Sequence, residues 1–399
     1  MTGKHLSRIS FLFLSVFYLM GCTEEKVSSS GVQVIELQRE NNELRSELKL
    51  VTDALSTLEK AQDGFVTQQV VGEPVKYMDK GRTLEDVLNR KVLICGGNAD
   101  LPGFGYLDPD SSSFIGFDID FCRAIAAAVL GEQGSNQIEI IPLTSRLRFA
   151  ALQAGEVDVL TRNTTWTMTR DAEMRANYTG VNFYDGQGIM VRKQDEIRKL
   201  SDLQNKSVCV QSGSTSATNV ADYFFQIGIP VEVQQFDERV AALKQYEDKV
   251  CDGYTGDKTS LLAQRTLLSE PAQHIILHKE ISREPLGPLV RHNDDNWQDI
   301  VRWTLQCMLN AEFEGLSQEN IIERLASESE FVNQALGIDS QLGRKMGLAD
   351  DFCLQVIKQV GNYKDVYERH LGPETELDLP RGLNALFVDG GLHYPLPFR

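Results

Sequence analysis

Short apolar segments alternate with amphipathic segments from about residue 84 onward. The apolar segments at 91–95, 138–142 and 157–160 have the length of buried strands, whereas 116–130 and 148–154 carry apolar residues at helical spacing. Strands that alternate with helices in this way are typical of a layered α/β domain with a parallel sheet. The pattern therefore predicts an α/β fold for this part of the chain.

The same alternation begins again after residue 192. Strands are predicted at 203–211, 231–235 and 251–255, and helices at 213–226 and 239–246 lie between them. Two successive α/β units of roughly 100 residues each are long enough to form separate cores. They indicate two lobes with a crevice between them.

These elements divide the chain into segments. The pattern predicts lobe 1 at 84–190, lobe 2 at 191–286 and a mostly helical segment at 287–399 that returns to lobe 1. The junction between the lobes is predicted at 189–192. The clearest helix of the last segment runs over 297–311.

Residues 33–61 repeat apolar side chains at the a and d positions of a heptad. Seven of the eight a and d positions are apolar, and the exception is Asn41 at an a position. A polar a residue favours a parallel two-stranded coiled coil. The segment therefore predicts a coiled-coil helix that forms a parallel homodimer, with a single amphipathic helix packed on the domain as the alternative. Residues 22–32 would form a tether before it and 62–83 a linker after it.

The first residues have the pattern of an export signal. Basic side chains precede an apolar run at 9–20, which is shorter than the roughly 20 residues of a membrane-spanning helix. Leu19 and Gly21 precede Cys22 in a sequence similar to the lipobox of bacterial lipoproteins, which predicts a signal peptide at 1–21 and lipidation of Cys22. This interpretation places the protein in the periplasm or at the cell surface, anchored to a membrane through Cys22. An ordinary signal peptide followed by a chance cysteine is the alternative.

The composition narrows the class of partner. A formal net charge of −17 argues against nucleic acid or anionic lipid. Six cysteines follow Cys22, and in an exported chain they favour disulfides, although the sequence leaves their pairing open. No Cys-x-x-Cys spacing, phosphate-binding loop or His-Glu-x-x-His sequence is present, so no metal site and no cofactor are predicted.

Three places put polar side chains directly after a predicted strand, where open α/β sheets bind ligands. The first, at 161–170, carries hydroxyl and amide side chains and ends on an arginine, which suits a carboxylate. The second, at 211–216, is a strand-to-helix turn with Ser214 and Thr215, whose free N–H groups favour an anion. The third ends on Asp257, a carboxylate suited to an ammonium group.

Each place alone has a simpler explanation. Serine and threonine after a strand usually cap a helix, and Asp257 is equally suited to cap a helix at 258–267. Arg170 and Asp171 are adjacent and suit a surface ion pair. The joint occurrence of the three places, one in lobe 1 and two in lobe 2, favours a ligand site in the crevice.

Nine short motifs are spread over residues 84–399. They are GFDID at 116–120, LQAGEVD at 152–158, RNTTWT at 162–167, GST at 213–215, KEISREPLGP at 279–288, DIVRWTL at 299–305, KQVGNY at 358–363, RGLNAL at 381–386 and GGLHY at 390–394. With these motifs the segment resembles the general L-amino acid-binding proteins of ABC transporters, within the bacterial extracellular solute-binding family 3. The resemblance implies a two-lobed, type II periplasmic-binding-protein fold with a hinge. It also implies that the protein binds a free L-amino acid for the permease of an ABC transporter, without catalysis.

The resemblance, carried over residue by residue, implies which side chains touch the ligand. The candidates are Arg170 as the carboxylate clamp, Asn163 and Thr165 as further contacts to the amino-acid head, Ser214 and Thr215 as donors from lobe 2, Asp257 as the partner of the ammonium group and Phe104 as a wall for the ligand's side chain. Trp166 and Tyr184 are further wall candidates. The resemblance also implies disulfides, which are Cys209–Cys251, Cys95–Cys122 and Cys307–Cys353.

Two other functions are compatible with the same scaffold. An enzyme, such as a periplasmic dehydratase of cyclohexadienyl acids, needs a buried general acid near the ligand, and no carboxylate other than Asp257 is evident at the three places. A sensor that reports amino acids to a partner is compatible with the predicted coiled coil. Relatives of this kind are mostly soluble and lead from a plain signal peptide into lobe 1, so the anchor and the coiled coil are departures from the pattern.

Overall fold

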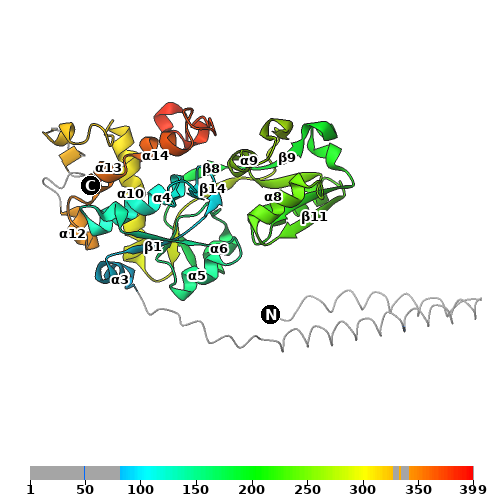
Figure 1. Cartoon of the computed structure of the whole chain (residues 1–399). Helices are drawn as coiled ribbons and strands as arrows, with labels where there is room; N and C mark the ends of the chain where they lie inside the picture. Colours follow the sequence, from blue (N-terminus) through cyan, green and yellow to red (C-terminus); the bar gives the residue numbers. More distant parts are fainter. Residues whose placement is uncertain (1–48, 50–80, 327–331, 334–340, 399) are drawn as a thin grey trace, which may run out of the picture. The chain divides into compact units, whose positions relative to one another are not determined.

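A computed structural model of the chain describes residue 49 and residues 81–326, 332–333 and 341–398 (Figure 1). The predicted signal peptide, tether and coiled coil, and the linker up to residue 80, lie outside the described residues, apart from Lys49, which is helical and exposed. The chain divides into two units, residues 1–74 and 75–399, and the architecture below is that of the second. Among the described residues, no helix has both the length and the apolar character needed to cross a membrane.

Lobe 1 is built on a five-stranded sheet with the order β5-β1-β6-β15-β7. β1 runs parallel to β5 and β6, whereas β15 runs antiparallel to β6 and β7. The strands are β1 (Leu93–Gly97), β5 (Ile138–Pro142), β6 (Val159–Leu160), β7 (Ala176–Tyr178) and β15 (Leu289–Arg291). A small antiparallel sheet joins β2 (Asp100–Leu101), β3 (Gly105–Leu107) and β4 (Phe114–Ile115). The helices are α3 (Thr83–Arg90), α4 (Phe117–Leu130), α5 (Arg148–Ala154) and α6 (Met168–Ala172).

Lobe 2 repeats the arrangement with the order β11-β10-β12-β9-β13. β10 is parallel to β11 and β12, and β9 is antiparallel to β12 and β13. The elements are β9 (Gln187–Arg192), β10 (Lys206–Gln211), α7 (Thr215–Gln226), β11 (Val231–Phe236), α8 (Arg239–Glu247), β12 (Gly253–Asp257), α9 (Lys258–Arg265) and β13 (His274–Ile276). Every residue of β9 is buried because apolar clusters cover both faces of this sheet, which is usual for an inner strand of an α/β sheet.

Two antiparallel strands, β8 (Phe183–Asp185) and β14 (Glu284–Leu286), connect the lobes. Figure 1 shows both between the two sheets. The chain passes from lobe 1 to lobe 2 along β8 and returns along β14 into β15. The predicted junction at 189–192 falls within β9, a strand of the second sheet. Because β9 belongs to the second sheet, the chain crosses from lobe 1 to lobe 2 a few residues earlier than predicted. Apolar alternation identifies such a strand but does not show which sheet it joins.

The C-terminal helices pack on lobe 1. They are α10 (Asp295–Phe313), α12 (Leu342–Met346), α13 (Phe352–Gln359) and α14 (Tyr363–His370). α10, α13 and α14 contact α4, which is buried along almost its whole length and is apolar nearly all round, as a helix between two layers must be. Short 3-10 helices lie at η1 (Gly134–Asn136), η2 (Lys193–Asp195), η3 (Leu200–Leu203), η4 (Pro271–Gln273), η5 (Glu323–Ala326), η6 (Gly382–Asn384) and η7 (Phe387–Asp389).

Three disulfides join elements that are distant in the sequence. Lobe 1 contains one between β1 and α4, lobe 2 contains one between β10 and the segment before β12, and the third joins α10 to α13. The pairs are Cys95–Cys122, Cys209–Cys251 and Cys307–Cys353. The paired cysteines are 27, 42 and 46 residues apart in the sequence, respectively. Disulfides that close loops of this length typically stabilise a fold by about 2–4 kcal/mol.

Candidate ligand-binding site

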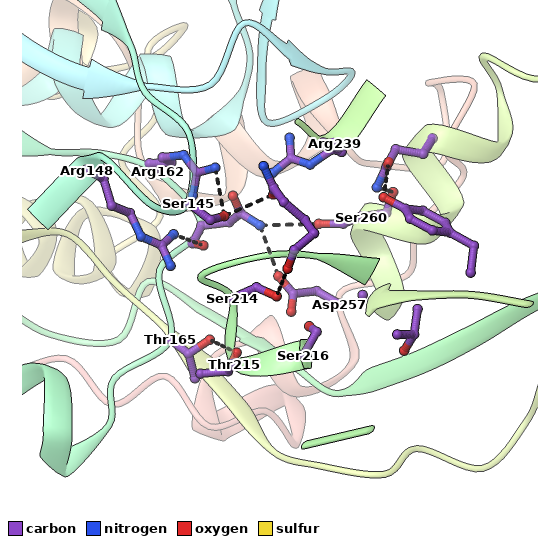
Figure 2. A pocket seen from close by; sticks show the side chains of 16 residues that line it. Ser145, Arg148, Arg162, Thr165, Ser214, Thr215, Ser216, Arg239, Asp257 and Ser260 are labelled. Atoms are coloured by element: carbon purple, nitrogen blue, oxygen red, sulfur yellow. Dashed lines mark hydrogen bonds between the residues drawn. The ribbon is translucent and has the colours of Figure 1, made fainter. Parts of the chain in front are cut away.

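A small pocket with a cavity volume of about 40 Å³ lies between the two lobes (Figure 2). Both lobes contribute to a lining that is almost entirely polar. The lining residues are Ser145, Arg148, Arg162, Asn163 and Thr165 from lobe 1 and Gln211, Ser214, Thr215, Ser216, Arg239, Tyr254, Thr255, Gly256, Asp257, Ser260 and Gln264 from lobe 2.

The polar lining follows from the places where strands end. The loop after β6 carries Asn163 and Thr165, the turn between β10 and α7 carries Ser214 and Thr215, and β12 ends on Asp257. The carboxyl ends of parallel strands lie at one edge of each sheet, so these side chains meet where the two edges face each other. Five of the seven ligand contacts that the sequence predicted thus line one pocket.

Hydrogen bonds across this pocket hold the lobes together. The side-chain amide of Asn163 donates from Nδ2 to Oδ2 of Asp257 at 2.9 Å and to Oγ of Ser260 at 3.3 Å. The hydroxyl groups of Thr165 and Thr215 lie 3.3 Å apart. These contacts join the two lobes directly across the pocket, so the structure has the geometry of a closed cleft.

The two lobes also approach each other closely at the rim of the cleft. Ser145 of lobe 1 donates from its hydroxyl to Oε1 of Gln211 in lobe 2 at 2.9 Å. Gly213 has a positive φ of 69°, and a Cβ atom added to it would lie 3.1 Å from Cα of Arg146 in the opposite lobe. Glycine therefore allows the β10–α7 turn to approach the lobe 1 backbone closely.

Asp257 faces the pocket and does not cap a helix through its side chain. It occupies the N-cap position of α9, but its carboxylate makes no capping hydrogen bond. Burial raises the pKa of Asp257 to about 6; the negative charge of Glu284 adds to this shift and the hydrogen bond from Asn163 opposes it. The group is therefore mostly ionised at neutral pH and is available to a cation.

Glu284 contacts two pocket-lining residues, Thr165 and Thr215, and was not predicted from the sequence. It lies on β14 in the hinge and is 1 % exposed. Oε2 accepts hydrogen bonds from the hydroxyls of Thr165 at 2.6 Å and Thr215 at 3.0 Å, and Oε1 accepts one from Asn219 at 2.8 Å and another from Ser282. One carboxylate in the hinge thus holds hydroxyl groups from both lobes. The only signal in the sequence was its place within the motif at 279–288.

Three arginines line the pocket, although none had been assigned to the ligand. Arg239 donates from Nη1 to Asp100 at 2.9 Å, an ion pair across the cleft. Arg162 donates from Nε to the carbonyl oxygen of Leu143 at 2.9 Å, and burial lowers the pKa of Arg162 to about 9. Arg148, at the start of α5, is 2 % exposed, and no described carboxylate lies within ion-pair distance of it.

The Ser214 hydroxyl caps α7. It accepts a hydrogen bond from the backbone N–H of Ala217 at 3.3 Å and donates to the carbonyl oxygen of Gln211 at 2.6 Å. The simpler explanation offered by the sequence therefore applies to this hydroxyl, although Ser214 also lines the pocket. Thr215, by contrast, directs its hydroxyl toward Thr165 and Glu284.

Arg170 lies outside the pocket lining. Its Nη1 donates to the carbonyl oxygen of Thr165 at 2.9 Å, to which the Tyr178 hydroxyl also donates at 2.6 Å. The side chain is 5 % exposed, and its guanidinium lies 5.5 Å from the ring centroid of Phe149. Arg170 is therefore not part of a surface ion pair; in this closed geometry it supports the loop that carries Thr165.

The aromatic wall candidates also lie outside the lining. Phe104 is 1 % exposed and belongs to the lobe 1 core, where it makes edge contacts with Phe117 and Phe183. Trp166 stacks on Tyr178 at 5.1 Å. Tyr184 lies on β8, where its backbone exchanges hydrogen bonds with the side chain of Asn384. None of these three rings lines the pocket, and Tyr254 is the aromatic residue of the described chain that does.

Two lobes on mixed five-stranded sheets, two connecting strands and a polar pocket closed between the lobes define a two-lobed solute-binding protein. The chain belongs to the bacterial extracellular solute-binding proteins, family 3, whose model matches residues 93–321. The family predicted from the sequence motifs is thereby confirmed, as is the two-lobed fold.

This chain aligns with almost the full length of several named relatives. The general L-amino acid-binding periplasmic protein AapJ of Rhizobium johnstonii is 42% identical over 319 residues, which cover 79% of this chain and 93% of the relative. The glutamate/glutamine/aspartate/asparagine-binding protein BztA of Rhodobacter capsulatus is 41% identical with the same coverage. An ABC transporter periplasmic binding protein from Brucella ovis, solved with glutathione bound, superimposes with a TM-score of 0.77 at 41% identity and covers 79% of this chain and 99% of its own.

Proposed function

We propose that the protein is the substrate-binding component of an amino-acid ABC transporter, which binds a free L-amino acid between its lobes and delivers it to a membrane permease. The observation that carries the proposal is the convergence of the Asp257 carboxylate with hydroxyl and guanidinium donors on one closed pocket. These groups complement the ammonium and carboxylate groups that L-amino acids share. The names of the relatives AapJ and BztA support the same ligand class.

The ammonium group of the ligand binds Asp257, whose carboxylate is oriented by the amide of Asn163. The carboxylate group binds the hydroxyls of Thr165 and Thr215 and the free N–H groups at the start of α7, where the helix dipole favours an anion. Arg170 lies directly behind Thr165. To bind the ligand's carboxylate, the guanidinium of Arg170 has to give up its hydrogen bond to the carbonyl oxygen of Thr165 and donate to the ligand instead.

A solute held by both lobes favours the closed form. Thr165 belongs to lobe 1, whereas Thr215 and Asp257 belong to lobe 2, so a ligand that contacts all three binds the closed arrangement better than an open one. That difference in affinity drives closure about β8 and β14. A permease that contacts both lobes then distinguishes the loaded protein from the empty one.

The family acts outside the cytoplasm. We further propose that a lipid anchor at the N-terminus and the coiled coil that follows it attach the protein to a membrane. Lipidation at Cys22 would hold the protein to a membrane, and a parallel coiled coil at 33–61 would pair two copies above it. Both features rest on the sequence pattern. Metabolic labelling with a radioactive fatty acid tests the anchor: incorporation into the wild type but not into a Cys22→Ser variant is expected, and label in both would refute it.

The function is tested first by identifying the ligand. The purified chain is denatured, released amino acids are identified by mass spectrometry, and each is titrated into ligand-free protein by calorimetry. Asp257→Asn is expected to weaken binding by at least roughly 2 kcal/mol because it removes the partner of a buried charge. Glu280→Gln, which changes a nearby carboxylate paired with Lys258 at the surface, serves as the control. If no L-amino acid binds more tightly than millimolar, the proposal fails.

A further inference from the structure

The connecting strand β8 is held by a side chain from the C-terminal segment. The backbone N–H of Tyr184 donates a hydrogen bond to Oδ1 of Asn384 at 2.7 Å, and Nδ2 of Asn384 donates one to the carbonyl oxygen of Tyr184 at 3.1 Å. In β14, the residue opposite Tyr184 is Pro285, which has no N–H group. The amide group of Asn384 thus pairs with β8 at this residue as the backbone of a further strand would.

Asn384 is itself fixed to lobe 1. Its side chain is buried, and its backbone carbonyl oxygen accepts hydrogen bonds from Nε and Nη2 of Arg381 at 3.0 and 2.9 Å. Arg381 also pairs with Glu312 of α10 at 3.0 Å, and its guanidinium lies 5.1 Å from the ring centroids of Tyr363 and Tyr367 of α14. α10 and α14 pack on the core of lobe 1 (Figure 1), so Asn384 moves with that lobe.

Further contacts from the same part of the chain hold the start of β8. The hydroxyl of Tyr363 donates to the carbonyl oxygen of Asn182 at 2.8 Å, and the ring of His393 lies 5.3 Å from the ring of Tyr184. These contacts come from residues 363–393, whereas the family model matches residues 93–321. The lobe 1 end of the hinge is therefore held by a part of the chain outside the region that matches the family.

Lobe 2 holds β8 from the next residue onward. The carboxylate of Asp185 accepts hydrogen bonds from the backbone N–H of Thr259 at 3.2 Å and from its hydroxyl. The backbone N–H of Lys258 donates to the carbonyl oxygen of Gly186 at 2.8 Å. Lys258 and Thr259 begin α9 of lobe 2. The change from lobe 1 contacts to lobe 2 contacts therefore falls between Tyr184 and Asp185.

The second connecting strand, β14, changes lobes at the same level. The carbonyl oxygen of Pro285 accepts a hydrogen bond from the backbone N–H of Trp166 in lobe 1 at 2.8 Å. Glu284, the residue before it, holds Asn219 and a threonine hydroxyl of lobe 2 as well as a threonine hydroxyl of lobe 1. The pairs in register are Tyr184–Pro285 and Asp185–Glu284. Both strands thus pass from one lobe to the other at the same step of the ladder.

We infer that Asn384 is a positioning residue that anchors β8 to lobe 1 and confines the opening of the cleft to two junctions, Tyr184–Asp185 in β8 and Glu284–Pro285 in β14. While the amide holds Tyr184, the backbone before Asp185 does not bend. Without the amide, bending extends back into β8, and the open state gains conformational freedom that favours it over the closed state. The inference goes beyond the proposed function, because the separation of the lobes is a property of the hinge and not of the solute.

Distances between two spin labels measure this separation. Glu139→Cys on β5 and Glu232→Cys on β11 carry the labels, since both side chains are exposed on the edge strand of their sheet. In ligand-free protein, Asn384→Ala is expected to broaden the distance distribution and to shift it to longer distances. Calorimetry with L-glutamate as the probe is expected to show binding weakened at least about fivefold, the effect of freeing one backbone residue in the open state.

Asn310→Ala is the matched control. Asn310 is a buried amide on α10, and its Nδ2 donates to the carbonyl oxygens of Gln306 and Leu396, both at 2.8 Å. This variant is expected to lower stability and to leave the distance distribution unchanged. If Asn384→Ala keeps the wild-type distribution, or if Asn310→Ala broadens it equally, the inference is overturned while the proposed function stands.

Two further outcomes are kept separate. Circular dichroism checks the fold of Asn384→Ala; should it not fold, Tyr363→Phe decides, because it removes the hydroxyl bound to Asn182 and keeps the ring. A smaller shift to longer distances is then expected, and a wild-type distribution overturns the inference. If the wild type binds neither L-glutamate nor any other L-amino acid, the proposed function is refuted, and the distances of the ligand-free protein still decide on Asn384.

Discussion

Replacing Glu284 by glutamine separates the electrostatics of the hinge from its shape. The carboxylate of Glu284 is almost completely buried and accepts hydrogen bonds from both lobes. Its negative charge is also the second cause, after burial, of the raised pKa of Asp257. Glutamine keeps the size of the side chain and one acceptor oxygen but removes the charge.

The stability change can be worked from the four hydrogen bonds. Glutamine keeps its oxygen toward Asn219 and Ser282 and turns its amide toward the hydroxyls of Thr165 and Thr215, which must rotate to accept. All four hydrogen bonds to a charged group then become neutral ones, at a cost of about 1 kcal/mol each, and the smaller desolvation penalty of a buried neutral amide offsets part of this loss. We expect Glu284→Gln to lower the free energy of unfolding by roughly 2 kcal/mol, measured by urea denaturation.

The change in ligand binding is more diagnostic than the change in stability. Asp257 must be ionised to bind an ammonium group, so wild-type affinity is expected to fall as the pH drops through about 6. At one pH unit below this value the ionised fraction, and with it the affinity, is roughly tenfold smaller. In Glu284→Gln the pKa of Asp257 is expected to be lower, because one cause of its rise is gone, and the affinity is retained to a lower pH.

Calorimetric titrations between pH 4.5 and 8 measure the midpoint of the pH-dependent fall in ligand affinity, both in the wild type and in Glu284→Gln. Glu280→Gln, in the same segment but at the surface, is expected to leave the midpoint unchanged. An equal or higher midpoint in Glu284→Gln would refute the electrostatic coupling.

The stability of the unliganded protein is expected to depend on pH in the opposite direction from the ligand affinity. The folded pKa of Asp257, about 6, exceeds its ordinary value of 3.8, so its contribution to stability is complete below pH 3.8 and is lost as the pH rises through 6.

Three further changes test separate parts of the molecule. Arg170→Met is expected to weaken ligand binding by at least roughly 3 kcal/mol in calorimetry if it clamps the ligand's carboxylate, and near-normal affinity would assign it solely to the support of Thr165. Replacing Cys209 and Cys251 together by alanine is expected to lower stability by about 2–4 kcal/mol in chemical denaturation, whereas an unchanged midpoint would mean that the cross-link contributes nothing. Deletion of 31–62 is expected to convert a dimer to a monomer in sedimentation, and a monomer in both forms at micromolar concentration would count against the coiled coil.

Local patterns in the sequence predicted the elements well because each element has its own periodicity. β5 and α5 have the predicted bounds, and α7 and β11 differ from them by a residue or two. The lobe boundary was misplaced because β9 is defined by its hydrogen bonds to β12 and β13, which are distant in the sequence. Periodicity carries no information about such pairings.

The residues in and beside the pocket divide in the same way. Asn163, Thr215 and Asp257 were predictable because each follows a strand at the ligand-binding edge of its sheet. Arg148 and Glu284 follow no such rule. One begins a helix and the other lies on a connecting strand, and both face the pocket region only because the lobes close on each other.

The position of Glu284 connects the strands between the lobes to two threonines that line the pocket. The strand that must bend when the lobes open is the strand whose carboxylate holds Thr165 and Thr215 together. Opening the cleft separates these hydroxyls and breaks at least one charged hydrogen bond, worth about 1.5–3 kcal/mol. A ligand that fits between the two threonines replaces their direct contact and keeps both hydroxyls near Glu284. Under the proposed function, closure and occupancy are therefore expected to be coupled at Glu284, and because Glu284 is charged, the coupling is expected to reach the ionisation of Asp257 as well.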